Sequence, residues 1–160
     1  MQDIRLRSLI LLVIISIVLT IDYLSKKSIE ALDQTIILNS FITLYKVNNP
    51  GVAFSILDTL DNRGLFILNL IIISILIIVM RELYLNVKKS LLYTIGLSMI
   101  FAGGLGNLID RYDNYSVTDF ISIHIGNIYF PAIFNLADVS ISFGALLIII
   151  HFIKEKNEVN

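Results

Sequence analysis

Two aspartates in apolar surroundings are the residues best suited to chemistry in this sequence. Asp119 lies in the run Val-Thr-Asp-Phe-Ile, and Asp138 lies close to the start of a long apolar segment. Two carboxyls in weakly polar surroundings can share one proton, so that one acts as a base and the other as an acid. A structural salt bridge, with Arg111 as the candidate cation, would explain the same residues. The residues alone leave both interpretations open.

Asn135 precedes Asp138 by three residues, so the two share one face if the segment is helical. The amide could then hydrogen-bond the carboxylate, or it could cap the start of the helix. Asp22 and Lys26 are four residues apart, and we expect them to pair on an exposed helix end. Asn69 lies within an apolar segment, where a helix–helix hydrogen bond is the expected role.

Several kinds of chemistry are excluded or disfavoured. The chain contains no cysteine, which excludes a disulfide, a thiolate metal site and a cysteine nucleophile. His124 and His151 have no partners at metal-ligand spacing. No Gly-rich phosphate loop, Ser-x-x-Lys pair or His-Glu-x-x-His motif is present. We therefore expect neither a metal nor a cofactor.

The composition places these residues in a membrane protein. Of 160 residues, 56% are hydrophobic and only 16% are charged, and the mean hydropathy is +0.83. A soluble domain of this size carries about a quarter charged residues, so the apolar excess must face lipid. The net charge of -1 provides no basic field, and we expect no nucleic-acid partner.

Four stretches are long enough to cross a bilayer as helices, which requires about 20 residues each. They cover residues 8–24, 64–80, 90–109 and 134–153. We therefore predict an all-α polytopic membrane protein, a single membrane domain over residues 1–160 with four transmembrane helices. The first stretch has the basic start and apolar centre of a signal peptide, but no small-residue cleavage pattern follows it, and we expect it to be retained.

Cations predict the orientation of these helices. Seven of the 12 lysines and arginines fall in the N-terminal segment, the 81–89 loop and the C-terminal tail, whereas the longer 25–63 and 110–133 loops hold five. The positive-inside bias then puts both termini in the cytoplasm and the long loops outside. On this topology the charged and amide residues gather at the outer ends of the helices, namely Asp22, Asn49, Asn107, Asp110, Arg111, Asp119, Asn135 and Asp138. A one-sided cluster favours chemistry at the outer interface over a transport path through the membrane.

The outer loops also have structural signals. Residues 35–47 are rich in β-branched and aromatic residues, a turn follows at Asn49–Gly51, and residues 52–56 are apolar again, so we predict a small sheet at the membrane surface. Residues 110–133 mix apolar and polar types, and we expect this loop to lie in the interface. Gly103, Gly104 and Gly106 would let another helix or a ligand approach the backbone of the third helix, and we expect close helix packing to be the reason.

Five motifs in order resemble those of the lipoprotein signal peptidases, also called signal peptidase II, which are aspartyl peptidases of the bacterial cytoplasmic membrane. The motifs occupy residues 22–26 (Asp-Tyr-Leu-Ser-Lys), 49–54 (Asn-Pro-Gly-Val-Ala-Phe), 103–111 (Gly-Gly-Leu-Gly-Asn-Leu-Ile-Asp-Arg), 117–121 (Val-Thr-Asp-Phe-Ile) and 134–138 (Phe-Asn-Leu-Ala-Asp). The resemblance covers nearly the whole chain. Val52, Val139 and an approach to Asn135 that is one residue longer than usual depart from the family pattern, but no polar motif residue is lost.

The resemblance implies a specific activity. Asp119 and Asp138 would be the catalytic aspartates, which bind and activate a water without an acyl-enzyme. The substrate would be a prolipoprotein carrying diacylglycerol on a cysteine, cut just before that cysteine, beside membrane lipid. The substrate-site positions would be Asn49, Gly51, Asn107, Arg111 and Asn135, with Asp22 as a structural or substrate-proximal aspartate.

Because such a site is complete within one chain, we expect a monomer. The sequence leaves two other classes of function open. A small proton- or cation-coupled carrier would use the aspartate pair as a relay, and a structural membrane protein would do no chemistry. Polar groups in the inner half, which a carrier needs, are nearly absent from the sequence.

Overall fold

A computed structural model of the chain describes residues 2–31, 34–50 and 61–159. Its elements in chain order are α1 (Gln2–Glu30), β1 (Ile36–Ile37), β2 (Ile42–Asn49), α2 (Asn62–Leu85), α3 (Leu91–Asn114), β3 (Val117–Ile125), β4 (Ile128–Tyr129) and α4 (Leu136–Val159). All four helices are long and apolar enough to cross a membrane. Their outer surfaces expose many leucine and isoleucine side chains, which a bilayer would cover. The predicted fold class is confirmed.

The helix boundaries differ from the predicted spans, and α1 and α2 extend beyond theirs at both ends. Helix α3 continues to Asn114, five residues beyond the predicted end at 109, and so carries Asp110 and Arg111. Hydropathy marks where the hydrocarbon ends, but a helix can continue into the polar interface because its backbone hydrogen bonds are internal. Helix α4 begins at Leu136 and not at 134, because Asn135 lies just before the first turn and caps it.

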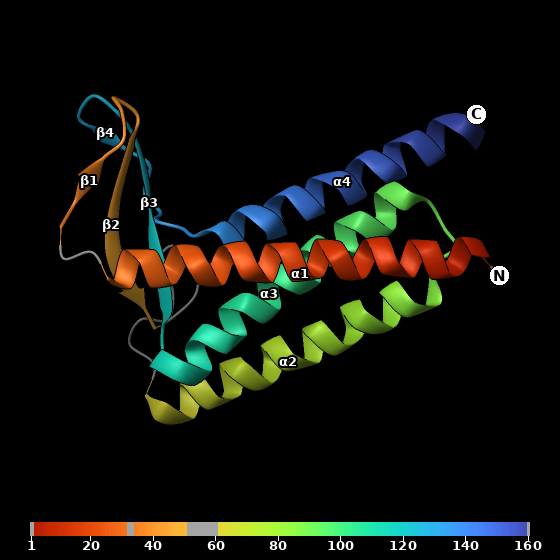
Figure 1. Cartoon of the computed structure of the whole chain (residues 1–160), viewed down its shortest axis with the longest axis horizontal. Helices are drawn as coiled ribbons and strands as arrows, with labels where there is room; N and C mark the ends of the chain where they lie inside the picture. Colours follow the sequence, from red (N-terminus) through yellow and green to blue (C-terminus); the bar gives the residue numbers. More distant parts are fainter. Residues whose placement is uncertain (1, 32–33, 51–60, 160) are drawn as a thin grey trace.

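Helix α3 is the centre of the bundle, and α1, α2 and α4 all pack against it (Figure 1). Glycines bring its backbone against that of α4. A Cβ atom added at Gly96 would lie 2.7 Å from the carbonyl oxygen of Gly144, and one at Gly144 would lie 2.6 Å from that of Gly96. A Cβ at Gly103 would meet the carbonyl oxygen of Ala137. The predicted close packing of Gly103 is therefore confirmed, and it fixes the first turn of α4 against α3.

The sheet joins both outer loops. It is antiparallel with the strand order β1-β2-β3-β4, and β2 pairs with β3 from Val117 opposite Asn49 to Ile123 opposite Ile42. The prediction of a small sheet is confirmed for residues 36–49. Its predicted partner at 52–56 lies outside the described residues, and the observed partner is β3 from the second loop. Only the second half of β3 has a period-2 pattern, in which Ile121, Ile123 and Ile125 alternate with Ser122 and His124.

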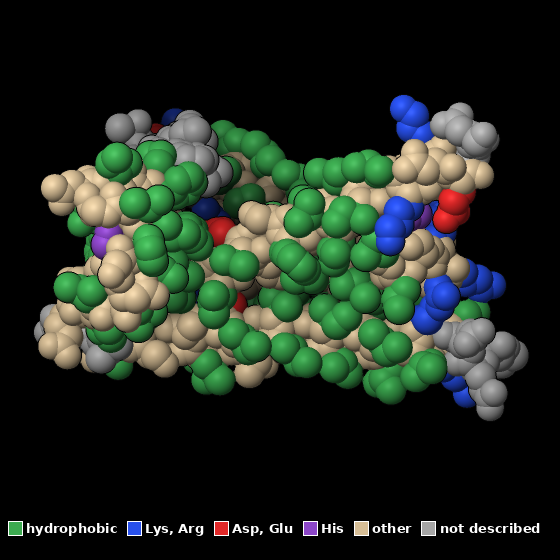
Figure 2. Space-filling view, turned by 90° about the horizontal axis from the view of Figure 1, so that it is seen from above, with side chains coloured by type: hydrophobic (Ala, Val, Ile, Leu, Met, Phe, Trp, Pro, Cys, Tyr) green, Lys and Arg blue, Asp and Glu red, His purple; other side chains and the backbone are tan. Residues whose placement is uncertain are grey.

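The two ends of the molecule differ in character. The sheet covers one end of the bundle, and the N- and C-termini lie at the other (Figure 1). Lysine and arginine side chains gather at the end with the termini (Figure 2). There Arg7 Nη1 donates to the carbonyl oxygen of Lys89, which ties α1 to the α2–α3 connection. The polar residues singled out in the sequence lie at the opposite end, beneath the sheet.

Candidate active site

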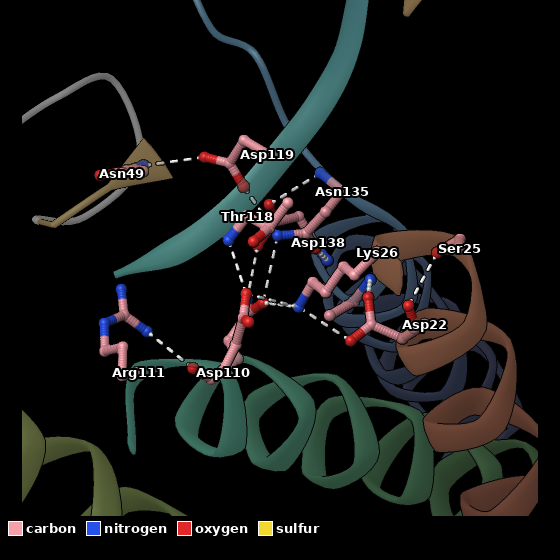
Figure 3. A network of polar contacts seen from close by, with 12 residues as sticks. Asp22, Ser25, Lys26, Asn49, Asp110, Arg111, Thr118, Asp119, Asn135 and Asp138 are labelled. Carbon is pink, nitrogen blue, oxygen red and sulfur yellow. Dashed lines mark hydrogen bonds and ion pairs between the residues drawn. The ribbon is translucent and has the colours of Figure 1, made fainter. Parts of the chain in front are cut away.

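Asp119 reaches the end of the helix bundle from strand β3. Because β3 pairs with β2, Asn49 lies beside it, and Asn49 Nδ2 donates to Asp119 Oδ2 at 2.9 Å. Asn135 Nδ2 donates to the other carboxyl oxygen, Oδ1, at 2.7 Å. The aspartate is only 3% exposed. Both carboxyl oxygens of this buried group therefore accept from neutral amides (Figure 3).

Asp138 is held by the first turn of α4. The backbone N–H of Asn135 donates to Asp138 Oδ2 at 3.2 Å, and the backbone N–H of Asp138 donates to Asn135 Oδ1 at 2.9 Å. This reciprocal arrangement has the form of a capping box, with an aspartate at the third helical position. Both sequence interpretations of Asn135 therefore hold: it caps α4 and it hydrogen-bonds carboxylates. It is fully buried and touches both aspartates.

Asn107, on α3, completes the connection between the aspartates. Its Nδ2 donates to Asp138 Oδ1 at 2.9 Å. Its Oδ1 accepts from Asn135 Nδ2 at 3.1 Å and from Lys26 Nζ at 3.0 Å. Strand β3 and helices α1, α3 and α4 thus each contribute a side chain to one continuous hydrogen-bonded network (Figure 3).

The environment of Asp119 favours its protonated form. Its pKa is raised from 3.8 to about 6, chiefly by burial and also by the negative charge of Asp138, while hydrogen bonds from Asn49 and Asn135 and the charge of Lys26 oppose the rise. A carboxyl with such a pKa can hold a proton close to neutral pH. Two carboxyls in one amide network, one of them easily protonated, are suited to general acid–base chemistry.

The two aspartates line the polar end of a large cavity of about 900 Å³. Asn49, Asn107 and Arg111 line the same end, and Figure 2 shows an acidic side chain at the bottom of the hollow. Most of the remaining wall is apolar and comes from α2, α4 and the 130–134 segment, including Leu68, Ile72, Ile75, Phe130, Ile141, Phe143 and Leu146. This cavity can take a largely apolar ligand and present one polar bond of it to the carboxyl pair.

Arg111 lies beside the aspartates without supplying their hydrogen bonds. Its Nη1 donates to the backbone carbonyl oxygen of Asn107 at 3.5 Å, and its charge interacts with both Asp119 and Asp138. Within the described part of the chain, the hydrogen bonds to the two carboxyls come from asparagine side chains and a backbone N–H. The arrangement is that of a carboxyl pair with a nearby cation, and a simple salt bridge does not account for it.

Asp22 and Lys26 form the expected pair, at 2.9 Å, but the prediction of an exposed helix end is wrong. Both side chains are buried, because this part of α1 packs against α3 and α4. Asp22 Oδ1 accepts from the backbone N–H of Ala137 at 2.9 Å. Asp22 lines a separate cavity of about 280 Å³ between α1 and α3.

Three further positions, Gly51, Asn69 and Asp110, were also singled out in the sequence. Gly51 lies outside the described residues. The expected helix–helix hydrogen bond of Asn69 is wrong for its oxygen, because Oδ1 is buried and has no hydrogen-bond partner within the described part of the chain. Sequence reasoning missed that Asp110 accepts a hydrogen bond from the backbone N–H of Thr118, which anchors the start of β3 on α3.

Comparison with known proteins identifies the family. Residues 14–154 match the family model described as signal peptidase (SPase) II. The chain belongs to the signal peptidase II family. A lipoprotein signal peptidase of Anaplasma phagocytophilum is 32% identical over 160 residues, which cover 96% of this chain and 98% of that protein. The lipoprotein signal peptidase of Yersinia pseudotuberculosis is 37% identical over 90% of this chain and 88% of its own length.

The match to another relative covers fewer residues at a higher sequence identity. The lipoprotein signal peptidase of Bartonella henselae is 41% identical over 110 residues, which cover 69% of this chain and 66% of that protein. Two solved structures of bacterial membrane enzymes share the fold of this chain. One has a TM-score of 0.75 at 28% identity over 94% of this chain and 91% of its own, and the other has 0.70 at 29% over 90% and 92%. These relatives give no support to the carrier alternative.

Proposed function

We propose that this chain is an aspartic endopeptidase that removes the signal peptide from diacylglyceryl-modified prolipoproteins, cutting just before the lipidated cysteine. The observation that carries this proposal is the pair of buried carboxyls, Asp119 and Asp138, bridged by Asn135 at the polar end of an apolar cavity. Membership of the signal peptidase II family supplies the substrate class.

Asp119 and Asp138 act together on one water molecule. The ionised carboxyl takes a proton as the water attacks the scissile carbonyl, and the protonated carboxyl gives its proton to the leaving amine. We assign the acid role to Asp119, because burial raises its pKa to about 6. Asp138 is then the base, held as an acceptor by N–H donors from Asn107 and Asn135. No acyl-enzyme is formed in this sequence.

Polar residues at the end of the cavity orient the substrate backbone. Asn49, Asn107, Arg111 and Asn135 supply N–H donors around the carboxyl pair, and Gly51 belongs to the same set by the family motif. The apolar walls from α2 and α4 accommodate the lipid chains and the hydrophobic part of the signal peptide. A substrate that is lipidated beside its scissile bond matches this division between polar end and apolar wall.

The site lies at the outer face of the membrane and both termini lie in the cytoplasm. The gathering of lysine and arginine at the end with the termini supports this orientation. The protein acts as a monomer, since one chain supplies both carboxyls and their partners. No metal or cofactor takes part in the proposed steps.

The test compares two forms of one substrate with the purified protein in detergent and a chelator present. One prolipoprotein carries diacylglycerol on its cysteine, and the other is identical but unmodified. We expect cleavage before the lipidated cysteine and no cleavage of the unmodified form, as determined by mass spectrometry. A folded protein that is inert towards the lipidated form would overturn the proposed activity, and equal cleavage of both forms would overturn the assigned substrate class.

A further inference from the structure

Lys26 is a buried charged residue that the proposed reaction does not use. Its side chain is about 5% exposed, and its Nζ lies 2.9 Å from Asp22 Oδ2 and 3.6 Å from Asp110 Oδ2. The described residues that line the cavity holding Asp119 and Asp138 do not include Lys26. It has no place against a substrate in that cavity, so any effect on the reaction must pass through another residue.

Asn107 is the residue through which Lys26 reaches the carboxyl pair. Lys26 Nζ donates to Asn107 Oδ1 at 3.0 Å, and Asn107 Nδ2 donates to Asp138 Oδ1 at 2.9 Å. An ammonium has only donors, and an ionised carboxylate has only acceptors. If the amide turned over, its NH₂ would face the ammonium and its oxygen would face the carboxylate. Lys26 therefore opposes that rotation and directs a donor at Asp138.

Asn135 is a second donor to Asn107, but it does not fix the orientation of the Asn107 amide throughout the reaction. Asn135 Nδ2 also donates to Asn107 Oδ1, but it donates to Asp119 as well. The carboxyls exchange protons during the reaction, and a protonated carboxyl can donate as well as accept. The preference for one orientation of each neighbouring amide then weakens. Lys26, paired with Asp22 and close to Asp110, presents donors at every stage. Its charge also makes the bond to Asn107 stronger than a neutral one.

We propose that Lys26 is a positioning residue that holds the Asn107 amide with its NH₂ towards Asp138 throughout the catalytic cycle. This inference rests on the proposed peptidase function. It assigns the aspartate–lysine pair of α1 a role in the reaction in addition to its role in packing. The residue on α1 thereby acts on a carboxyl of α4 through a side chain of α3.

The test is a double-mutant cycle on cleavage of the lipidated prolipoprotein, with Lys26→Met, Asn107→Ala and the double variant. A hydrogen bond to a charged group contributes about 1.5–3 kcal/mol, so we expect Lys26→Met to lower kcat about tenfold or more while KM stays within about twofold. If Lys26 acts through Asn107, the double variant loses no more kcat than Asn107→Ala alone. An unchanged kcat in folded Lys26→Met, or losses that add in the double variant, would overturn the inference.

Three further variants keep the test decisive. Lys26→Met leaves Asp22 buried without its ammonium, which destabilises the fold. Lys26→Met combined with Asp22→Asn removes both charges and retains an amide oxygen for the Ala137 N–H, and its kcat is compared with that of Asp22→Asn. Lys27→Met is the matched control, because Lys27 is the neighbouring lysine, is half-exposed and pairs with Glu30. Failure of the wild-type protein to cleave would count against the peptidase function, whereas wild-type cleavage with equally active Lys26 variants would count against this inference alone.

Discussion

At the scale of single residues, the site depends on amides that hold two carboxyls in different environments. Asp119 accepts from two asparagine side chains, whereas Asp138 accepts from one side chain and one backbone N–H. Burial shifts the pKa of Asp119 upward despite these bonds. Because the pKa of Asp119 differs between the folded and unfolded states, its titration changes the stability of the protein.

Asp119 should make the stability of the protein depend on pH in a defined direction. Its pKa rises from 3.8 to about 6 on folding, so the folded state binds the proton more tightly. The stabilisation from the proton is complete below pH 3.8 and is lost as the pH rises through 6. Relative to Asp119→Asn, the free energy of unfolding of the wild type should fall by about 3 kcal/mol over this range, since one pKa unit corresponds to about 1.4 kcal/mol.

Thermal unfolding in detergent between pH 4 and pH 8 measures this difference. The Asp119→Asn variant is the reference, because every other titrating group is common to both proteins. The quantity to compare is how the difference in unfolding temperature between the two proteins changes with pH. Parallel stability curves for the two proteins would show that Asp119 titrates normally and would remove the basis for its role as the acid.

At the scale of elements, the seam between α3 and α4 fixes the distance between Asn107 and Asp138. Gly96 should be intolerant of alanine, because the new Cβ would lie 2.7 Å from the backbone oxygen of Gly144. Gly104 is the matched control on the same helix, since its new Cβ would meet the end of the Leu76 side chain, which can rotate away. Overpacking a core costs about 1–3 kcal/mol.

We therefore expect Gly96→Ala to unfold in detergent at a clearly lower temperature than the wild type and Gly104→Ala to show a smaller loss. The measurement is the midpoint of thermal unfolding for the three proteins under one set of conditions. Equal midpoints for Gly96→Ala and wild type would mean that the backbones of α3 and α4 do not pack as closely as in the structure.

The sequence predicts the helices better than the sheet. The helix positions follow from uninterrupted hydropathy, a signal that each segment carries alone. Strand β3 was not predicted, because only residues 121–125 alternate between apolar and polar types and its partner β2 lies about 70 residues earlier in the chain. The motif residues Asp119, Asp138, Asn107 and Asn135 were identified, but the burial of Lys26 was not. Whether a charged pair at a helix end is exposed depends on which helix packs over it, and spacing does not contain that information.

At the scale of the whole molecule, the sheet lies at one end and cationic side chains gather at the other. Since the chain has no cysteine, single cysteines can report its orientation without background. Asn127→Cys lies exposed between β3 and β4, and Glu158→Cys lies exposed near the end of α4.

In intact spheroplasts, a membrane-impermeant maleimide should label Asn127→Cys, whereas Glu158→Cys should react only after the membrane is broken. The comparison of labelling before and after lysis is the measurement, and cleavage activity of both variants serves as the control for correct folding. The opposite pattern would place the carboxyl pair on the cytoplasmic side and would contradict the proposed orientation.

The most direct test of Asp119 and Asp138 as the catalytic pair is the turnover of a diacylglyceryl-modified prolipoprotein. Wild type, Asp119→Asn and Asp138→Asn are compared, each purified in detergent with a chelator present. An asparagine nearly preserves the shape of each side chain but can neither take nor give the proton. We expect both variants to fold, as judged by thermal unfolding, and to lose cleavage entirely while the wild type cuts before the lipidated cysteine. Near-normal turnover by either folded variant would contradict the assignment of the carboxyl pair as the catalytic centre.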